Sequence, residues 1–142
     1  EADLIIFSMG SLYTSLLPNL IVKELQEAIK KSDAKVLYVC NTVNDPCETK
    51  NYKVSDYLKT IEKTLGFKRL DAVIIGDSKQ VPKEMISKYQ KEEGKEIVKL
   101  DRKEVEKMGV EILNENIITT EDGTIKHDSF KLALVIFNYL MK

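Results

Sequence analysis

The apolar residues of this chain alternate between short unbroken runs and longer stretches with helical spacing. Unbroken runs predict strands that are buried on both faces of a sheet. They occupy residues 3–7, 35–40, 71–75 and 96–100. Charges interrupt the last run, which therefore suits a sheet edge. Amphipathic spacing predicts helices over residues 16–31, 54–65 and 83–92. This alternation predicts a three-layer α/β fold with at least four mostly parallel strands.

The final third of the chain follows a different pattern. Residues 102–108 predict a short helix, and residues 110–126 are less regular. Asp122-Gly123 between two β-prone runs predicts a hairpin. A last helix begins after Asp128 and is apolar almost all round, so we expect it to be covered on more than one side. A homodimer, or packing against an absent amino-terminal part, would cover it.

Composition limits the choice of partners. The 142 residues suit a single α/β domain, although a start almost directly in a buried strand suggests a fragment of a larger one. The net charge of −1 argues against nucleic acid, and no stretch is long enough to span a membrane. Arg69 and Arg102 are the only arginines, so binding of an anion would rely on backbone and hydroxyl donors. The spacing of Cys40 and Cys47 does not match that of a zinc site, so we expect no resident metal. We expect both cysteines to be reduced and the protein to be cytoplasmic.

The turn after the first strand is the leading candidate for a binding site. Ligands bind parallel sheets at the carboxyl ends of strands, and a helix start favours anions. The turn matches neither a phosphate-binding Walker loop nor a dinucleotide fingerprint, because Gly10 stands alone and no lysine follows it. Ser15 is the expected N-cap of the helix that follows, and Ser55 that of the next. The candidate ligand residues are Gly10, Ser11, Leu12, Tyr13, Thr14 and Ser15. The alternative is that Gly10 only supplies a tight turn and the hydroxyls cap the helix.

A second candidate loop, residues 41–53, follows the second strand and is long for an α/β connection. It would lie beside the first loop if the two strands are neighbours, and otherwise it is a solvated surface loop. Asp45, Glu48 and Asp77 could hold Mg²⁺ or a ribose, or they could be solvated carboxylates. His127, the only histidine, is a further candidate, but before a helix start it is more often structural.

Several motifs together resemble a known family. They are Gly10 to Ser15, Pro18-Asn19-Leu20, Cys40-Asn41, Pro46, Glu48-Thr49, His127-Asp128 and Lys131-Leu132-Ala133. This set is similar to the carboxyl-terminal part of gluconeogenesis factors, the YvcK-like branch of the CofD-like family. Ser8-Met9 departs from the usual Gly-Pro of that branch, and Cys47 replaces a glycine. The glycine-rich amino-terminal motif of the family is absent, so half of the ligand site could lie elsewhere.

The resemblance implies a Rossmann-like fold and a cytoplasmic protein that acts in central carbon metabolism and cell shape. It implies binding of a nucleotide-sugar diphosphate and adds Asn41, Thr42, Glu48 and Thr49 to the ligand residues, with His127 and Asp128 as further candidates. The sister branch of 2-phospholactate transferases moves phosphate-linked groups with Mg²⁺. The chain could therefore be a regulatory binding protein or a Mg²⁺-dependent transferase. The lack of an evident general acid or base favours the binding protein.

Overall fold

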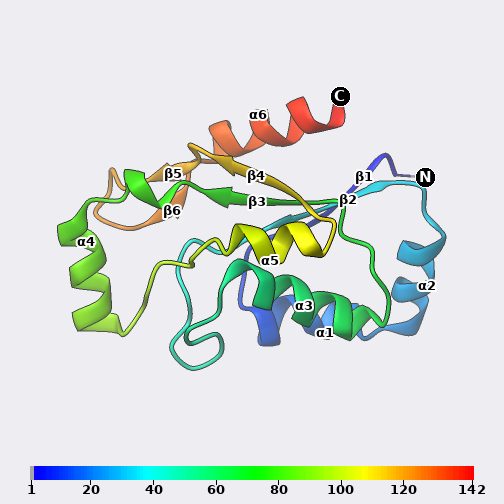
Figure 1. The fold of residues 1–142 in the computed structure, drawn as a ribbon, viewed down its shortest axis with the longest axis horizontal. Coiled ribbons are helices and arrows are strands. Elements are labelled where there is room, and N and C mark those ends of the chain that lie inside the picture. The colour runs from blue at the N-terminus through cyan, green and yellow to red at the C-terminus, as the bar shows by residue number, and fades with distance from the viewer. Residues whose placement is uncertain (1) are drawn as a thin grey trace.

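The computed structural model describes residues 2–142 and has the expected α/β class. Four parallel strands form one sheet in the order β1 (Leu4–Phe7), β2 (Lys35–Val39), β3 (Ala72–Gly76) and β4 (Glu111–Glu115). Chain order and sheet order are therefore the same, as Figure 1 shows. Successive strands run in one direction, so all four carboxyl ends lie at the same edge of the sheet.

Helices cover both faces of this sheet and give the three expected layers (Figure 1). One face carries α1 (Leu17–Leu20), α3 (Val54–Leu65) and α5 (Arg102–Lys107), with α2 (Lys23–Lys31) beside them near the amino end of β2. The other face carries α6 (Ser129–Leu140). Beyond the carboxyl edge lie α4 (Lys83–Lys88) and the hairpin β5 (Ile118–Thr119) and β6 (Lys126–His127).

The two central strands are apolar because both of their faces are buried. Val36 and Tyr38 of β2 join one core with Tyr57, Leu58 and Ile61 of α3. The alternate residues of β2 and β3 join a second core, which also contains Leu113 of β4 and Leu132 of α6: Leu37, Val39, Ala72 and Ile74. Successive side chains of a strand point to opposite faces, so a strand between two cores reads as an unbroken apolar run.

The prediction of a strand at residues 96–100 is wrong. Ile97 and Lys99 make only isolated bridges, to Val43 and Lys53 of the second loop, and do not join the sheet. Val98 is buried in the same core as β2 and α3, which explains the apolar pattern. The fourth strand is β4, at residues 111–115. Its sequence carries two glutamates and an asparagine because it lies at an edge, and its pattern is correspondingly weak.

The single helix predicted over residues 16–31 is divided. A π-helical turn, Leu12–Leu16, leads into α1, and Val22 takes an extended backbone before α2 begins. The side-chain amide of Gln26 donates to the carbonyl of Leu20 at 2.6 Å. This hydrogen bond gives a partner to a carbonyl at the end of α1, where the helix stops.

Both predicted N-caps are wrong by a few residues. Ser11, not Ser15, precedes the first turn, and its carbonyl accepts from the Ser15 and Leu16 amides. At α3 the cap position is Lys53, whose backbone N–H donates to the Asp56 carboxylate at 2.8 Å. Ser55 lies inside α3 and donates to Asp101 instead.

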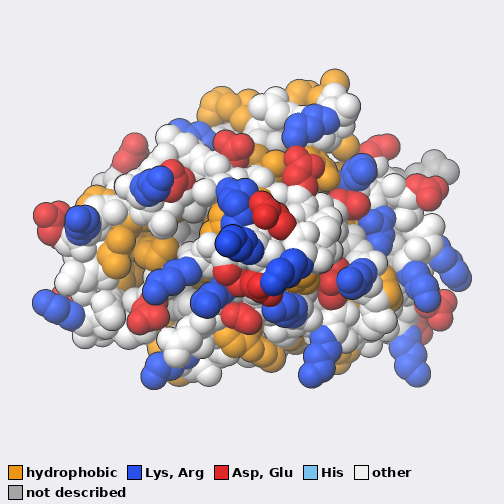
Figure 2. Space-filling model, in the orientation of Figure 1, with side chains coloured by type: hydrophobic (Ala, Val, Ile, Leu, Met, Phe, Trp, Pro, Cys, Tyr) orange, Lys and Arg blue, Asp and Glu red, His pale blue; other side chains and the backbone are white. Residues whose placement is uncertain are grey.

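The predicted hairpin and the predicted start of the last helix after Asp128 are confirmed. Thr119 pairs with Lys126 in an antiparallel hairpin, and Asp128 caps α6 by accepting from the Lys131 amide at 3.0 Å. The outer side of α6 is apolar and exposed, and Figure 2 shows its hydrophobic side chains along the top of the molecule. Within residues 2–142, none of the helices has the length and apolar character that crossing a bilayer requires.

Candidate functional site

The two candidate loops meet at the carboxyl edge of the sheet, as expected for neighbouring strands. The Asn41 side chain brackets Gly10: its amide donates to the Gly10 carbonyl at 2.8 Å, and its oxygen lies 3.4 Å from the Gly10 amide. The Ser11 hydroxyl donates to the Glu48 carboxylate at 2.7 Å. The loop after β1 is thus joined to the loop after β2 by side chains that the sequence had singled out.

A polar hollow of about 180 Å³ opens between the two loops. It is lined by Ser11, Leu12, Asn41, Val43, Asn44, Asp45, Glu48, Thr49 and Lys95. Two carboxylates and one ammonium group therefore face the same small space. Because this volume is well below that of a typical ligand pocket, it can hold one polar group of a ligand and not a whole ligand.

Lys95 is a lining residue that the sequence did not indicate. It lies in the extended segment after Gly94, which bridges to the second loop. Its ammonium group donates to Glu93 at 2.7 Å, and this hydrogen bond raises the pKa of Lys95 above its usual value. The group stays cationic at neutral pH. Its position depends on a contact between distant segments, which no local pattern signals.

Buried hydrogen bonds hold the second loop in place. The Tyr57 hydroxyl, on α3, lies 2.8 Å from the Asn44 side-chain oxygen and 3.0 Å from the Thr49 hydroxyl. Thr49 in turn accepts from the Asp45 amide at 2.9 Å. Burial raises the pKa of Tyr57 well above its usual value, so the hydroxyl remains a donor. Thr49, predicted as a ligand residue, is buried and acts by positioning the loop.

The first loop presents backbone and hydroxyl groups. The Leu12 side chain is buried in the core, so only its backbone is available to a ligand. Thr14 and Ser15 are exposed. The Tyr13 hydroxyl lies 2.6 Å from that of Tyr52, a hydrogen bond that raises the pKa of Tyr52. The amides at the start of this helical segment have no preceding turn to accept their hydrogen bonds, which suits them to an anion.

His127 reaches the same edge from β6. Its Nε2 lies 3.2 Å from the Cys40 carbonyl and 3.4 Å from the Thr42 hydroxyl, so the hairpin is tied to the end of β2. Asp128 caps α6, and Asp77 caps the short turn that follows β3 by accepting from the Lys79 amide at 3.0 Å. Both of these carboxylates therefore have local structural roles.

We expect the protonation of His127 to make the stability of the protein depend on pH. Burial lowers the pKa of His127, so the folded state favours the neutral ring. The unfolded chain binds a proton near the ordinary pKa of about 6.5. Stability that is present at higher pH is therefore lost as pH falls through this value, and the loss ends below the folded-state pKa. Urea unfolding between pH 8 and 5 should show this loss.

His127→Asn is the matched variant for this measurement. It keeps an amide that can reach the Cys40 carbonyl but does not titrate, so its stability should fall less over the same pH range. Identical pH profiles for the variant and the parent chain would contradict the assignment.

The site contains no obvious nucleophile or metal cluster. Cys40 is buried, which raises the pKa of its thiol to about 12, and Cys47 is exposed on the second loop. Across residues 2–142, no three or more His, Cys, Asp or Glu side chains gather in a way that could hold a metal ion. Any cation at Asp45 and Glu48 would need further oxygens from a ligand.

Known proteins share the fold of this chain and part of its sequence. A family model described as 2-phospho-L-lactate transferase CofD matches residues 1–118. The chain belongs to the CofD family. Among curated members, the gluconeogenesis factor of Bacillus subtilis is 37% identical over 140 residues, which is 99% of this chain and 44% of that protein. The gluconeogenesis factor of Listeria innocua is 38% identical over 133 residues, or 94% of this chain and 40% of that protein.

Solved structures agree with the CofD-family assignment. An X-ray crystal structure of a protein from Bacillus halodurans matches with a TM-score of 0.89 and 33% identity, covering 96% of this chain and 43% of that one. A second crystal structure, described as a UPF0052 family member from the same organism, also has a TM-score of 0.89. The chain thus spans less than half the length of these CofD-family relatives.

Proposed function

We propose that this CofD-family chain forms part of a cytoplasmic gluconeogenesis factor that binds a nucleotide-sugar diphosphate without turning it over. In this proposal, binding links central carbon metabolism to cell shape. The observation that carries the proposal is the joining of the loops after β1 and β2, through Asn41 to Gly10 and Ser11 to Glu48. Ligands of open α/β sheets bind at this edge of the sheet. The relatives from Bacillus subtilis and Listeria innocua are both named gluconeogenesis factors.

Each part of the ligand has a matching group in this proposal. The diphosphate lies against the backbone from Gly10 to Thr14, where helix-start amides and the Thr14 hydroxyl can donate. Glu48 accepts from a sugar or ribose hydroxyl. The Glu48 carboxylate accepts from Ser11 within this same segment, and Lys95, which lines the same hollow, offsets part of the carboxylate charge. Asn41 and Thr42 complete the polar wall beside the phosphates.

Calorimetric titration with UDP-glucose, ADP-glucose and GDP-mannose tests the proposal. We expect one of these probes to bind and Thr14→Ala to weaken its binding by about 0.5–1.5 kcal/mol, since one hydrogen bond to the phosphate is lost. Gly10→Val should block binding sterically. A Cβ at Gly10 would lie 3.6 Å from the Ser15 Cβ, an ordinary contact, so the variant should fold.

Thr64→Ala is the matched control for Thr14→Ala. Its hydroxyl donates to the Thr60 carbonyl within α3, so its loss should leave binding unchanged. A folded Gly10→Val variant with the affinity of the parent chain would place the phosphate elsewhere.

A transferase of phosphate-linked groups is the second candidate function. The description of the matching family model favours it. Glu48 and Asp45 could hold Mg²⁺ together with ligand phosphates, since Mg²⁺ commonly uses one or two carboxylates. Incubation with Mg²⁺ and the nucleotide sugar that binds decides between the two functions. A new phosphorylated product would support the transferase, and an unchanged ligand would support the binding protein.

A further inference from the structure

A second hollow, of about 330 Å³, opens along the extended segment 95–99; we call it the Ile97 hollow. All five residues of this segment line it, and Ser78, Ile86 and Gln90 form the opposite wall. Figure 2 shows hydrophobic side chains in this region, between α4 and the segment that leads to α5. Small-molecule pockets have volumes of about 300–1,000 Å³, so the Ile97 hollow is large enough for a ring system.

The backbone of Ile97 faces this hollow. On one side of Ile97, the Asn44 amide donates to the Glu96 carbonyl at 2.8 Å. On the other side, the Val98 amide donates to the Thr42 carbonyl at 2.9 Å. Backbone groups of successive residues in an extended segment point to opposite edges, so the N–H and C=O of Ile97 point away from the second loop. None of the described residues of that loop lines the Ile97 hollow, which therefore lies along the other edge.

The flanking backbone groups on this edge already have partners. The Lys95 amide donates at 3.2 Å to the carbonyl of Tyr89, which begins the helical turn after α4. The Lys99 carbonyl accepts from the Val54 amide at 3.1 Å. Within residues 2–142, no hydrogen bond uses the N–H or the C=O of Ile97. Unpaired backbone groups of this kind are rare, so a donor and an acceptor remain side by side for a partner from outside the chain.

The chemistry of the hollow matches that of a nucleobase. Proteins recognise an unstacked base by hydrogen bonds to the adjacent donor and acceptor of its edge and by apolar contacts with its faces. The side chains of Ile86 and Ile97 belong to one apolar cluster and supply such a contact. A peptide added as a strand fits less well, because it would pair with alternate residues, and Lys95 and Lys99 have each given a backbone group to another partner.

We propose that the Ile97 hollow receives the base of the nucleotide-sugar diphosphate and pairs its edge with the N–H and C=O of Ile97. This inference rests on the proposed function. The polar hollow between the two loops holds only one polar group, so most of the ligand needs further space. Lys95 lines both hollows, so a single ligand can extend from the phosphates past Lys95 to the base. Gln90 and Glu96 can then bond to the remaining polar atoms of the base.

Chemical-shift mapping of the chain with uridine, adenosine and guanosine tests the base site without the phosphates. We expect the nucleoside whose nucleotide sugar binds in the calorimetric titration to shift the Ile97 amide signal saturably. The amide of Gly66, which ends α3, should not shift. A nucleoside that shifts Ile97 when none of the three nucleotide sugars binds would support the base site and refute the proposed function. If neither a nucleoside nor a nucleotide sugar shifts Ile97, the base site is overturned.

Ile86→Trp should fill the Ile97 hollow. We expect it to weaken binding of the nucleotide sugar by at least about tenfold, because the base loses its space and its hydrogen bonds. Leu25→Trp is the matched control, since Leu25 on α2 is 39% exposed and lines a separate hollow beside β1. Circular dichroism establishes that each variant is folded. A folded Ile86→Trp variant with the affinity of the parent chain, or loss of binding by Leu25→Trp alone, would contradict the base site.

Discussion

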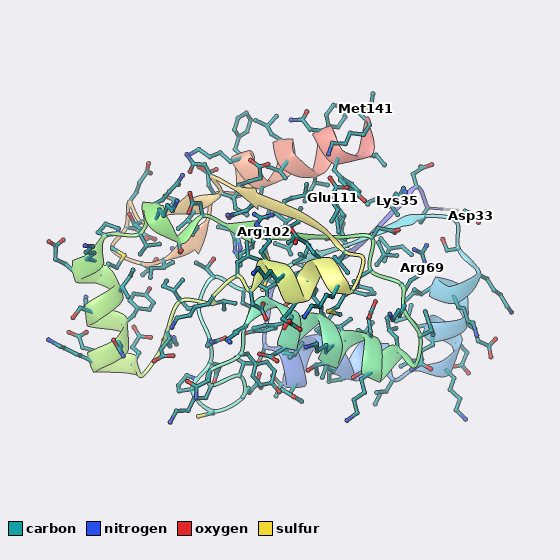
Figure 3. The ribbon with its side chains drawn as sticks, in the orientation of Figure 1. Asp33, Lys35, Arg69, Arg102, Glu111 and Met141 are labelled. Atoms are coloured by element: carbon teal, nitrogen blue, oxygen red, sulfur yellow. The ribbon has the colours of Figure 1, made fainter. Side chains whose placement is uncertain are left out.

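Arg69→Met is expected to lower the free energy of unfolding by about 2–4 kcal/mol, because several charge-assisted hydrogen bonds are lost at once. The Arg69 side chain lies between the amino ends of β2 and β3, where Figure 3 labels it. It donates to the carbonyls of Ser32, at 3.0 Å, and Ala34, and it lies 3.0 Å from the Asp71 carboxylate. Asp71 also accepts from the Val36 amide at 2.7 Å. One side chain therefore joins the end of α2 to two strands.

The other arginine supplies the control. Arg102 is exposed on α5, and its ion pair with Glu106 spans 3.8 Å, so Arg102→Met should change stability by less than about 0.5 kcal/mol. Arg69→Lys should recover only part of the loss, because an ammonium group cannot reproduce the planar set of donors. Chemical unfolding followed by circular dichroism measures all three variants. Equal effects of the two methionine substitutions would contradict the role of Arg69.

Tyr57→Phe should cost about 1–3 kcal/mol, because it removes a buried hydroxyl and leaves the Asn44 oxygen without that donor. The loss concerns the second loop most directly. Thr49 would keep its bond to the Asp45 amide but lose its contact with α3. We therefore expect faster hydrogen exchange at the Asp45 and Thr49 amides, and weaker binding of any ligand held by this loop.

Tyr139→Phe is the matched control for this prediction. It removes a hydroxyl from the side of α6 that faces the sheet, far from the second loop. It should leave exchange at Asp45 and Thr49 unchanged. If Tyr57→Phe lowers global stability without faster exchange in the loop, the hydroxyl stabilises the core and does not position the site.

The sequence predicted β1, β2 and β3, although β1 lies at a sheet edge and its Ile6 is 41% exposed, so the expected burial on both faces holds only for β2 and β3. β2 and β3 read as apolar runs because each lies between two cores. β4 was missed because three of its five residues are polar, whereas Val98 led to a false strand prediction because it is buried in the core without pairing in the sheet. Apolar patterns report burial, and burial does not require pairing in a sheet. The first helix is divided where the Gln26 amide donates to the carbonyls of Leu20 and Thr64, and the contact with Thr64 is a tertiary one that the spacing does not encode.

The candidate site could be predicted to the level of its two loops. Parallel strands end at one edge, so neighbouring β1 and β2 bring Gly10 and Asn41 together. Lys95 and Tyr57 could not be predicted, because each reaches the site from a separate segment through the tertiary fold. Thr49 was predicted as a ligand residue in the correct loop, but its side chain is buried and positions the loop.

The agreement between chain order and sheet order also affects how the molecule folds. Each strand pairs with the strand that comes next in the sequence, from Leu4 with Lys35 to Ala72 with Glu111. The crossovers have similar lengths, and the entropy of closing a loop rises slowly with its length, so the three pairings have similar entropic costs. Among the strands of residues 2–142, none has to insert between two others that are already paired. The sheet can therefore grow outward in either direction from β2 and β3, and during synthesis each new strand can join the last one made.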